Sequence, residues 1–356
     1  MTILRPSPQR AWVDVDLTAL VRNARTIASR SRARLLPMVK ANGYGLGAVR
    51  VSRALEAVDP WGFGVATVAE GIELRVAGLT RPIVVFSPVT PAGLDECAVH
   101  DLRPSLGDTA SLAAWLPTGR PFHLEIDTGM GRAGLRWSDG AALADAARLL
   151  APATGWEGVF THFHSSDSDP AATQVQWERF ELVLSALPSR PPLVHAANSA
   201  AALVGARYAA DLVRPGIFLY GGAAGGMAPE TVARLCARVI ATRHLQAGDS
   251  VSYGATWTAP GAVGVATLGI GYADGVPRSL SNHGAVEARG RRCPILGRVT
   301  MDMTMVESDA AVGDVATVFG GLVTLDQQAV AAGTISYELL TSLSPRVERR
   351  YAEPVS

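Results

Sequence analysis

Residues 34–67, RLLPMVKANGYGLGAVRVSRALEAVDPWGFGVAT, contain one repeat of the pattern that decides the fold. The first eight residues and the last seven are short apolar runs, which are typical of buried strands. Residues 47–57 between them have helical spacing. Strands that alternate with helices in this way indicate an α/β protein with a parallel sheet.

The alternation continues to residue 214. Segments rich in Ala, Leu and Arg, such as 141–150 and 171–187, separate eight apolar runs. These runs cover residues 34–41, 61–67, 82–87, 102–106, 121–127, 158–163, 193–197 and 211–214. Eight β/α alternations in about 200 residues fit a TIM barrel better than an open doubly wound sheet. We therefore predict a (β/α)8 barrel over residues 18–228.

The pattern changes after the glycine-rich loop GGAAGG at 221–226. Strands and turns follow it, such as VSYGATW at 251–257 and GVATLGIG at 264–271. We therefore predict a second, β-rich domain over residues 229–356. The opening segment AWVDVDL, residues 11–17, reads as a further strand, and the second domain is one place for it to pack.

Composition and charge narrow the function classes. The 32 Lys and Arg residues balance the 32 Asp and Glu residues, which argues against a nucleic-acid partner. The N-terminus lacks the apolar stretch of a secretory signal, and no apolar run is long enough to predict a membrane span. Cys97, Cys236 and Cys293 are not clustered, so we expect reduced thiols and no metal site. These features predict a cytoplasmic enzyme or ligand binder.

Lys40 is the only lysine in the chain, and every other basic residue is Arg. An amine can lose its proton and attack a carbonyl, which a guanidinium group cannot do. Lys40 ends the first predicted strand, and barrels place their chemistry at the C-terminal ends of their strands. The alternative is that one lysine remains by chance. Its setting favours the chemical interpretation.

Polar motifs end four other strands: DTGMGR at 127–132, THFHSSD at 161–167, HAANS at 195–199 and RPG at 214–216. The loops after the seventh and eighth strands of a barrel commonly bind phosphate, and they contain Ser199 and Gly216. An amine that faces a phosphate site suggests pyridoxal 5'-phosphate, bound to Lys40 as a Schiff base.

The chain resembles the alanine racemase family of fold-type-III pyridoxal-phosphate enzymes over essentially its whole length. Eight motifs carry the resemblance in the family's order: PMVKANGYGLG, IDTGMGRAGL, THFHSSD, HAANSAA, RPGIFLYG, VSYGATW, GYADGVPR and GRVTMDMTMV. The resemblance implies a racemase that interconverts L-alanine and D-alanine and supplies D-alanine for peptidoglycan. It also implies a head-to-tail homodimer in which each active site takes residues from the partner's β domain.

The resemblance assigns cofactor contacts to Lys40, Tyr44, His162, Asn198, Ser199, Arg214, Gly216 and Ile217. Tyr44, Ser199 and the backbone of Gly216 and Ile217 would hold the phosphate, and His162 would lie against the ring. A packed loop aromatic for Tyr44, a core histidine for His162 and a helix cap for Asn198 are the alternatives.

Arg214 would stand beside the pyridine nitrogen. An arginine cannot accept a proton there, so the ring takes less negative charge and the proton returns to Cα. That chemistry favours racemisation over transamination. A structural salt bridge at the barrel mouth is the alternative.

Racemisation needs a proton acceptor on each face of Cα. The resemblance gives Lys40 one face and Tyr253 of the partner subunit the other. A free tyrosine has a pKa near 10, so we expect nearby cations such as Arg214, acting through His162, to lower it.

Arg132 and the backbone N–H of Met301 would hold the substrate carboxylate. The resemblance places four further residues along the access corridor, with surface or structural roles as alternatives: Asp167, His195, Arg278 and Arg298. Tyr272 would narrow the same passage.

Two positions depart from the family. Many members have a carbamylated lysine where this chain has Glu125, so we predict a direct Glu125–Arg132 ion pair. Many members have a gate tyrosine where this chain has Pro345, so the gate is wider or another residue such as Tyr351 closes it. This departure weakens the expectation of strict alanine specificity.

Three alternatives remain for the function. A non-catalytic pyridoxal-phosphate carrier would lack the β domain. A decarboxylase for basic amino acids would need a catalytic cysteine, whereas Cys293 in RRCPILG reads as a strand residue. A racemase for serine or for a wider set of amino acids is the main competitor.

Overall fold

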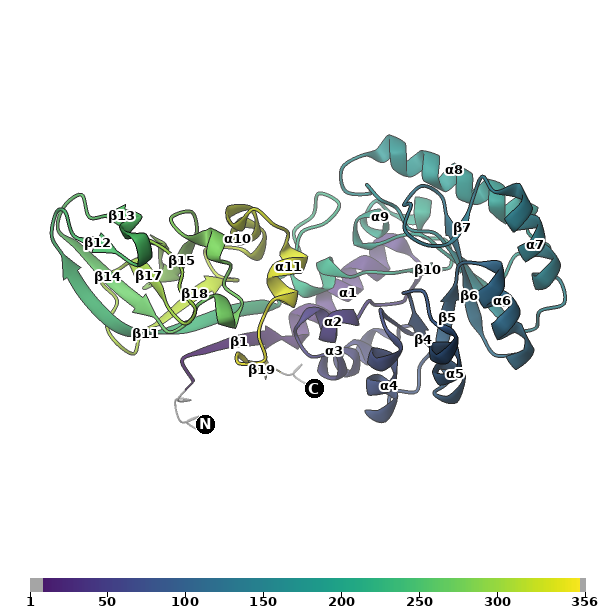
Figure 1. The fold of residues 1–356 in the computed structure, drawn as a ribbon, viewed down its shortest axis with the longest axis horizontal. Helices are drawn as coiled ribbons and strands as arrows, with labels where there is room; N and C mark the ends of the chain where they lie inside the picture. Colours follow the sequence, from purple (N-terminus) through teal and green to yellow (C-terminus); the bar gives the residue numbers. More distant parts are fainter. Residues whose placement is uncertain (1–8, 353–356) are drawn as a thin grey trace. The chain divides into compact units, whose positions relative to one another are not determined.

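A computed structural model describes residues 9–352, and these residues form two compact units. The barrel unit comprises residues 21–219 and 223–229. The β unit comprises the described residues up to 20, residues 220–222 and the described residues from 230 onward. Figure 1 shows the course of the chain through both units. Among the described residues, no helix is long and apolar enough to cross a membrane.

Eight parallel strands form the barrel unit. They are β2 (Arg34–Leu35), β3 (Phe63–Val65), β4 (Ile83–Val85), β5 (Arg103–Leu106), β6 (Phe122–Asp127), β8 (Trp156–Phe160), β9 (Leu193–His195) and β10 (Leu212–Val213). Their order is β2-β10-β9-β8-β6-β5-β4-β3, and the short strand β7 (Leu135–Arg136) also pairs with β6. A parallel bridge between Met38 and Gly64 joins the two ends of this order. The sheet therefore closes into the predicted TIM barrel.

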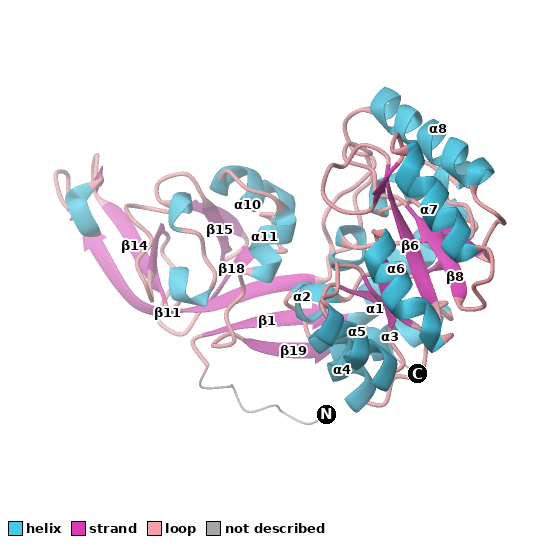
Figure 2. Cartoon of the chain, turned by 45° about the vertical axis from the view of Figure 1, so that its right-hand side comes forward, coloured by secondary structure: helices cyan, strands magenta, loops and turns pink. Residues whose placement is uncertain are grey.

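Helices precede or follow the barrel strands along the sequence and surround them (Figure 2). They are α1 (Leu17–Ser31), α2 (Lys40–Tyr44), α3 (Ala48–Leu55), α4 (Val68–Val76), α5 (Pro91–Val99), α6 (Thr109–Trp115), α7 (Gly140–Leu150), α8 (Pro170–Ala186) and α9 (Ser199–Leu203). Thr67 caps α4 in a capping box with Glu70, and Asp108, Asp139 and Asp169 cap α6, α7 and α8. Each side-chain oxygen accepts a backbone N–H of the first turn, which fixes where the helix begins.

Large apolar side chains fill much of the barrel core, among them the fully buried Phe63, Phe122 and Phe160. Their burial supplies the main driving force for this unit, at roughly 1.5–3 kcal/mol for each large side chain. The strands also bury ionisable groups: His123 and His195 have no exposed surface, and Glu125 is only 5% exposed. Buried ionisable groups lower stability unless they are paired, so their presence indicates a function.

An eight-stranded sheet forms the frame of the β unit. Its strands are β1 (Ala11–Asp16), β11 (Ala233–Leu245), β14 (Val263–Leu268), β15 (Ala285–Ala288), β16 (Arg291–Pro294), β17 (Thr304–Glu307), β18 (Val315–Phe319) and β19 (Glu348–Ala352). The opening strand β1 lies between β11, which is antiparallel to it, and β19, which is parallel.

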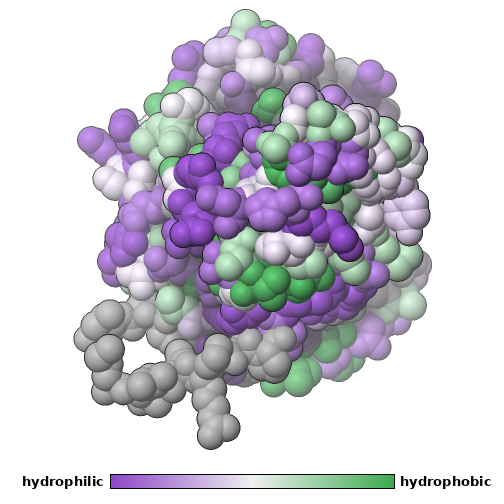
Figure 3. All heavy atoms as spheres, turned by 90° about the vertical axis from the view of Figure 1, so that its left-hand side faces the viewer, coloured by the Kyte–Doolittle hydropathy of each residue, from purple (hydrophilic) through white to green (hydrophobic). Residues whose placement is uncertain are grey.

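The hairpin β12 (Ser250–Val251) and β13 (Trp257–Thr258) and the helices α10 (Leu325–Ala332) and α11 (Ser336–Thr341) complete the β unit. One of its faces is mostly hydrophilic, with hydrophobic residues gathered in smaller clusters (Figure 3). The unit is thus mainly β, as the sequence predicts.

Candidate active site

Lys40 lies just beyond β2, at the C-terminal end of the barrel strands, and begins α2. Ala41, Asn42 and Tyr44 all have φ near +53°, so this turn is left-handed. The Ala41 N–H donates to Oε1 of Glu70 across 2.6 Å, which anchors the strained backbone. Burial lowers the pKa of the Lys40 amine, the charge of Arg132 lowers it further, and Glu70 opposes the shift. A lowered pKa leaves more of the amine in its nucleophilic form.

A small polar cradle lies at residues 199 and 216. The Gly216 N–H donates to Oγ of Ser199 across 2.9 Å. The Tyr44 hydroxyl lies against Gly216, because a Cβ built at residue 216 would come within 2.2 Å of that oxygen. Glycine is therefore the residue that lets Tyr44, Ser199 and this backbone meet, as a phosphate cradle requires.

Ile217 directly follows this cradle and is buried. Asn198 has a local role as the N-cap of α9. Its Oδ1 accepts from the Ala201 N–H at 3.1 Å and from Oγ of Ser166 at 2.8 Å. The capping alternative accounts for the Ala201 contact, and the Ser166 hydroxyl adds a second donor to the same oxygen.

Arg214 is buried directly after β10. Its guanidinium group donates to the carbonyl oxygens of Thr161 at 2.8 Å and Ala196 at 3.0 Å. It also contacts Nδ1 of His195 at 2.8 Å and Nδ1 of His162 at 3.3 Å. Burial lowers the pKa of Arg214 to about 9, although Glu125 opposes the shift. Within residues 9–352 no carboxylate forms a salt bridge with Arg214, so the salt-bridge alternative is not supported.

His162 is half-buried and lies beside Arg214. Burial lowers the pKa of His162 to about 3, with further lowering by Arg214, Arg132 and Lys40. The imidazole is therefore neutral at physiological pH. A neutral ring beside a guanidinium group accepts at Nδ1 and keeps a proton at Nε2.

The predicted Glu125–Arg132 ion pair is wrong for this structure. No salt bridge joins these residues, and the Glu125 carboxyl group contacts no other described cation within 4.0 Å. Glu125 is buried on β6 with its Cγ packed against Gly134, whereas Arg132 is exposed on the loop that follows. Burial raises the pKa of Glu125 to about 7, although Arg132 and Arg214 oppose the shift.

The two access-corridor predictions that fall in the barrel unit, Asp167 and His195, have different outcomes. Asp167 is exposed, and its Oδ1 accepts from the Gly225 N–H at 3.1 Å. His195 contradicts its prediction: it is fully buried, and its ring stacks on Phe160 with the centroids 5.0 Å apart. Its position on β9 turns the side chain into the barrel, so it lines no surface of this unit.

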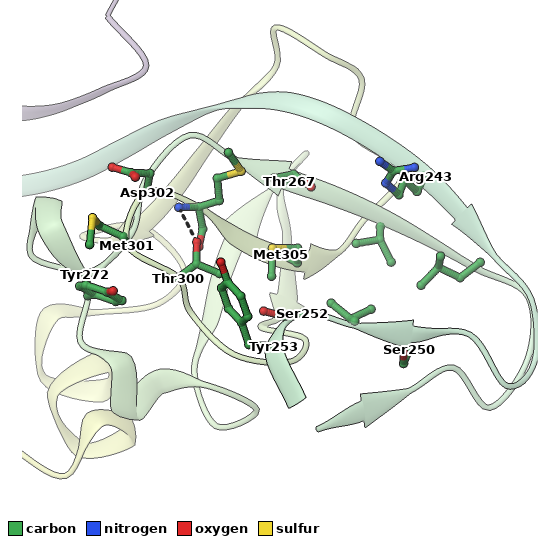
Figure 4. Close-up of a pocket in the computed structure, with 14 residues that line it drawn as sticks. Arg243, Ser250, Ser252, Tyr253, Thr267, Tyr272, Thr300, Met301, Asp302 and Met305 are labelled. Atoms are coloured by element: carbon green, nitrogen blue, oxygen red, sulfur yellow. Dashed lines mark hydrogen bonds between the residues drawn. The ribbon is translucent and has the colours of Figure 1, made fainter. Parts of the chain in front are cut away.

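Tyr253, Tyr272 and Met301 line one cavity of about 810 Å³ in the β unit (Figure 4). Tyr253 begins a short helical turn, and its side chain is 72% exposed. Before it, Ser252 adopts φ +67° and donates from Oγ to the Arg298 carbonyl at 2.7 Å. This strained residue and its bond set the direction of the turn that presents the phenol.

The buried carboxylate of Asp274 anchors the turn that contains Tyr272. Asp274 accepts from the Gly271 N–H at 3.0 Å and forms a salt bridge with Arg10 at 2.9 Å. The Ala273 N–H donates to the Met301 carbonyl at 3.0 Å, which ties this turn to Met301. The Met301 N–H itself donates no hydrogen bond to any described residue.

The remaining predicted corridor and gate residues lie outside the cavity lining. Arg298 lies beside the Tyr253 turn through its backbone, and Arg278 is exposed at the start of a separate helical turn. Pro345 is exposed, and Tyr351 lies on β19, paired with Val15. Tyr351 does not line this cavity, so the structure gives no support to it as a replacement gate.

Family models match nearly the whole chain. The alanine racemase N-terminal domain matches residues 15–224, and the alanine racemase C-terminal domain matches residues 232–351. The chain belongs to the alanine racemase family. This confirms the resemblance read from the sequence and the prediction of an enzyme.

Relatives within the alanine racemase family are similar along their full length. The alanine racemase of Symbiobacterium thermophilum is 40% identical over 366 residues, with 96% of each chain covered. That of Deinococcus radiodurans is 39% identical, with 96% of this chain and 99% of the relative covered.

Solved structures of alanine racemases agree with the fold. The enzyme from Streptomyces lavendulae superposes with a TM-score of 0.91 at 30% identity and covers 98% of each chain. The alanine racemase of Bartonella henselae, solved with covalently bound pyridoxal phosphate, has a TM-score of 0.90 at 29% identity. It covers 97% of this chain and 100% of its own.

Sequence reasoning missed three residues that support the alanine racemase site. Glu70 anchors the Lys40 turn, Asp274 anchors the turn that contains Tyr272, and His123 lies in the barrel interior beside His195. Glu70 was recognisable from the sequence, because Thr67 and Glu70 form a capping-box pattern. His123 was recognisable too, because it lies two residues before Glu125 on β6 and alternate strand residues share a face.

Proposed function

We propose that this protein interconverts L-alanine and D-alanine with pyridoxal 5'-phosphate as its cofactor. The observation that carries the proposal is that one amine, Lys40, and a buried arginine, Arg214, lie at the same end of the barrel. Arg214 has no carboxylate partner among the described residues. The family and the names of its relatives support the substrate. We further propose that the enzyme is cytoplasmic and supplies D-alanine for peptidoglycan.

The described residues fit the cofactor. The left-handed turn after β2 and the Gly216 cradle bring an amine and phosphate-binding groups to one end of the barrel. The cofactor, when bound, supplies a conjugated system that makes the Cα–H of an amino acid acidic. Seven residues would hold it: Lys40, Tyr44, His162, Ser199, Arg214, Gly216 and Ile217, whereas Asn198 would act as the cap of α9.

Arg214 directs where the proton returns. Its donors point to backbone carbonyls and to two neutral imidazoles, so it offers hydrogen bonds and accepts no proton. Such a group would give no proton-accepting partner to a ring nitrogen of the bound cofactor, so Arg214 would limit how much charge leaves Cα. The proton therefore returns to Cα, and racemisation exceeds transamination.

Two bases move the proton at Cα. The Lys40 amine serves one face, and the lowering of its pKa by burial favours the unprotonated form that a base requires. Tyr253 of the partner subunit serves the other face. A phenol that is 72% exposed, beside the exposed Met301 and Met303, supports a homodimer that covers this surface, because large exposed apolar patches mark interfaces.

In the proposed homodimer, Arg132 of one subunit and the Met301 N–H of the partner subunit hold the substrate carboxylate. The Met301 N–H has no acceptor among the described residues, so it is available for an anion. An arginine on the loop after β6 can pair with the same carboxylate through two parallel hydrogen bonds. The departure at Pro345 favours one competitor, a racemase that also accepts serine.

Chiral analysis of the purified protein tests the proposal. Protein with added pyridoxal 5'-phosphate should convert L-alanine to D-alanine, and both directions should reach the same mixture. L-Serine and L-lysine measure the breadth of specificity, and Lys40→Ala is the inactive control. Pyruvate or ethylamine as the main product from L-alanine would refute a racemase.

A further inference from the structure

A continuous chain of side chains crosses the interior of the barrel. Arg214 contacts Nδ1 of His195 at 2.8 Å, and Nε2 of His195 contacts Nδ1 of His123 at 2.8 Å. Nε2 of His123 then contacts Oε2 of Glu157 at 3.3 Å, and Nε of Arg103 donates to the same oxygen at 2.8 Å. Both histidines are fully buried.

This hydrogen-bonded series of side chains runs from one end of the barrel to the other. Arg214 follows β10 at the C-terminal end, where Lys40 lies. Glu157 is the second residue of β8 and Arg103 the first residue of β5, so both lie near the N-terminal ends of their strands. Glu157 and Arg103 are therefore remote from the proposed substrate.

Arg214 and Glu157, at the two ends of this hydrogen-bonded series of side chains, fix the direction of every hydrogen bond in it. A guanidinium group only donates, so Nδ1 of His195 must accept. An ionised carboxylate only accepts, so Nε2 of His123 must carry a proton and donate. Because each neutral imidazole carries one proton, Nε2 of His195 must donate to Nδ1 of His123. The four groups satisfy one another in this single arrangement.

The protonation states of the two histidines and of Glu157 agree with that arrangement. Burial lowers the pKa of His195 well below its ordinary value, and Arg214 adds to the shift. Burial also lowers the pKa of His123, although Glu157 opposes it, so both rings are neutral. Burial acts to raise the pKa of Glu157, but His123 and Arg103 outweigh it and keep this carboxylate ionised.

We propose that Glu157 and His123 are positioning residues for Arg214, acting through the tautomer of His195. The ionised carboxylate of Glu157 sets both imidazoles to their Nε2–H tautomers, which presents a bare Nδ1 to Arg214. Without that carboxylate, His195 is free to carry its proton on Nδ1, where it would oppose the Arg214 donor. The guanidinium group then loses one of its four acceptors and is held less firmly. The role in racemisation rests on the function proposed above.

Packing holds the two rings in the planes that this arrangement needs. His195 stacks on Phe160 at an interplanar angle of 14°, and the His123 ring lies 5.6 Å from that of Trp61. The rings therefore keep their places when a proton moves from one nitrogen to the other. The hydrogen-bond partners alone select the tautomer.

Nitrogen NMR of histidine-labelled protein tests the tautomers directly. In the wild type, with and without pyridoxal 5'-phosphate, His123 and His195 should both be neutral with the proton on Nε2. Glu157→Gln keeps an acceptor oxygen and should preserve both tautomers, whereas Glu157→Met should release them. Glu96→Met is the matched control, because Glu96 contacts Nε2 of His100 at the same 3.3 Å on an exposed helix.

Kinetics gives the second readout. Glu157→Met should lower kcat about tenfold with little change in KM, as loss of a group that orients a functional residue does. It should also raise the pyruvate formed per racemisation event. Glu157→Gln should retain most of kcat, and Glu96→Met all of it.

Each outcome decides the proposal. An Nδ1–H tautomer of His195 in the wild type overturns it, even if Glu157→Met fails to fold. Unchanged tautomers and kcat in folded Glu157→Met also overturn it. The predicted tautomers in a protein that does not racemise alanine would support the hydrogen-bond arrangement and refute the proposed function instead.

Discussion

The hydroxyl group of Tyr44 lies against the α-carbon of Gly216, so closely that no side chain fits between them. Tyr44 belongs to the turn after β2, and Gly216 belongs to the loop after β10, which is the neighbouring strand in the barrel. This contact joins the loop that carries Lys40 to the proposed phosphate cradle.

Gly216→Ala should weaken cofactor binding, because the new Cβ must displace the Tyr44 hydroxyl. Overpacking of this kind costs about 1–3 kcal/mol, so we expect the dissociation constant for pyridoxal 5'-phosphate to rise by about tenfold or more. Titration by absorbance measures it. Gly140→Ala is the control, because a Cβ at Gly140 meets nothing within 4 Å. Equal affinities for all three proteins would contradict the contact.

Glu125→Gln should stabilise the protein at high pH. Burial raises the folded-state pKa of Glu125 to about 7 from an ordinary 4.5, so the folded state binds this proton more tightly than the unfolded state does. Its contribution to stability is complete below about pH 4.5 and is lost as the pH rises through 7. The variant should therefore gain up to about 3 kcal/mol over the wild type at pH 8 and much less at pH 5.

Urea unfolding of the protein without cofactor, at fixed concentration, measures the Glu125 effect. Glu181→Gln on the exposed face of α8 serves as the control. A free-energy difference for Glu125→Gln that is the same at pH 5 and pH 8 would show that this carboxyl group does not titrate in the predicted range.

Arg214→Glu should divert the reaction toward transamination. A carboxylate at this position can share a proton with the ring nitrogen, so more charge leaves Cα and the proton returns elsewhere. We expect the ratio of pyruvate to D-alanine to rise by at least about tenfold, with lower overall turnover. The variant should also be less stable, because the Thr161 and Ala196 carbonyls lose their buried donor. An unchanged product ratio would remove Arg214 from the control of the reaction.

Tyr253→Phe should leave cofactor absorbance intact and reduce turnover from L-alanine to D-alanine by about 10²–10⁴-fold, the usual contribution of a general base. Tyr337→Phe, another partly exposed tyrosine of the β unit, is the control. Rates measured in both directions by circular dichroism report the effect. Retained L-to-D turnover in Tyr253→Phe would exclude this phenol as a base.

The fold was predictable because its signal is local and repeated. Each barrel strand is a short apolar run, and each is followed by a helix, so neighbouring residues alone indicate the architecture. Lys40 stood out for a similar reason, because it is unique in the composition.

The details of the site were less predictable because they depend on contacts between distant residues. His195 matches a corridor position in the family, yet a three-residue strand does not reveal which side faces the interior. Glu125 and Arg132 are seven residues apart, and only the loop conformation decides whether they pair. The chain from Arg214 to Glu157 joins four strand regions, and no sequence spacing encodes it.

Borohydride reduction followed by peptide mass spectrometry tests the central claim most directly. The protein incubated with pyridoxal 5'-phosphate should show an absorbance band that disappears on reduction, and the reduced cofactor should be found on the peptide that contains Lys40. A protein that takes up no cofactor, or that carries it on any group other than the Lys40 amine, would contradict the account.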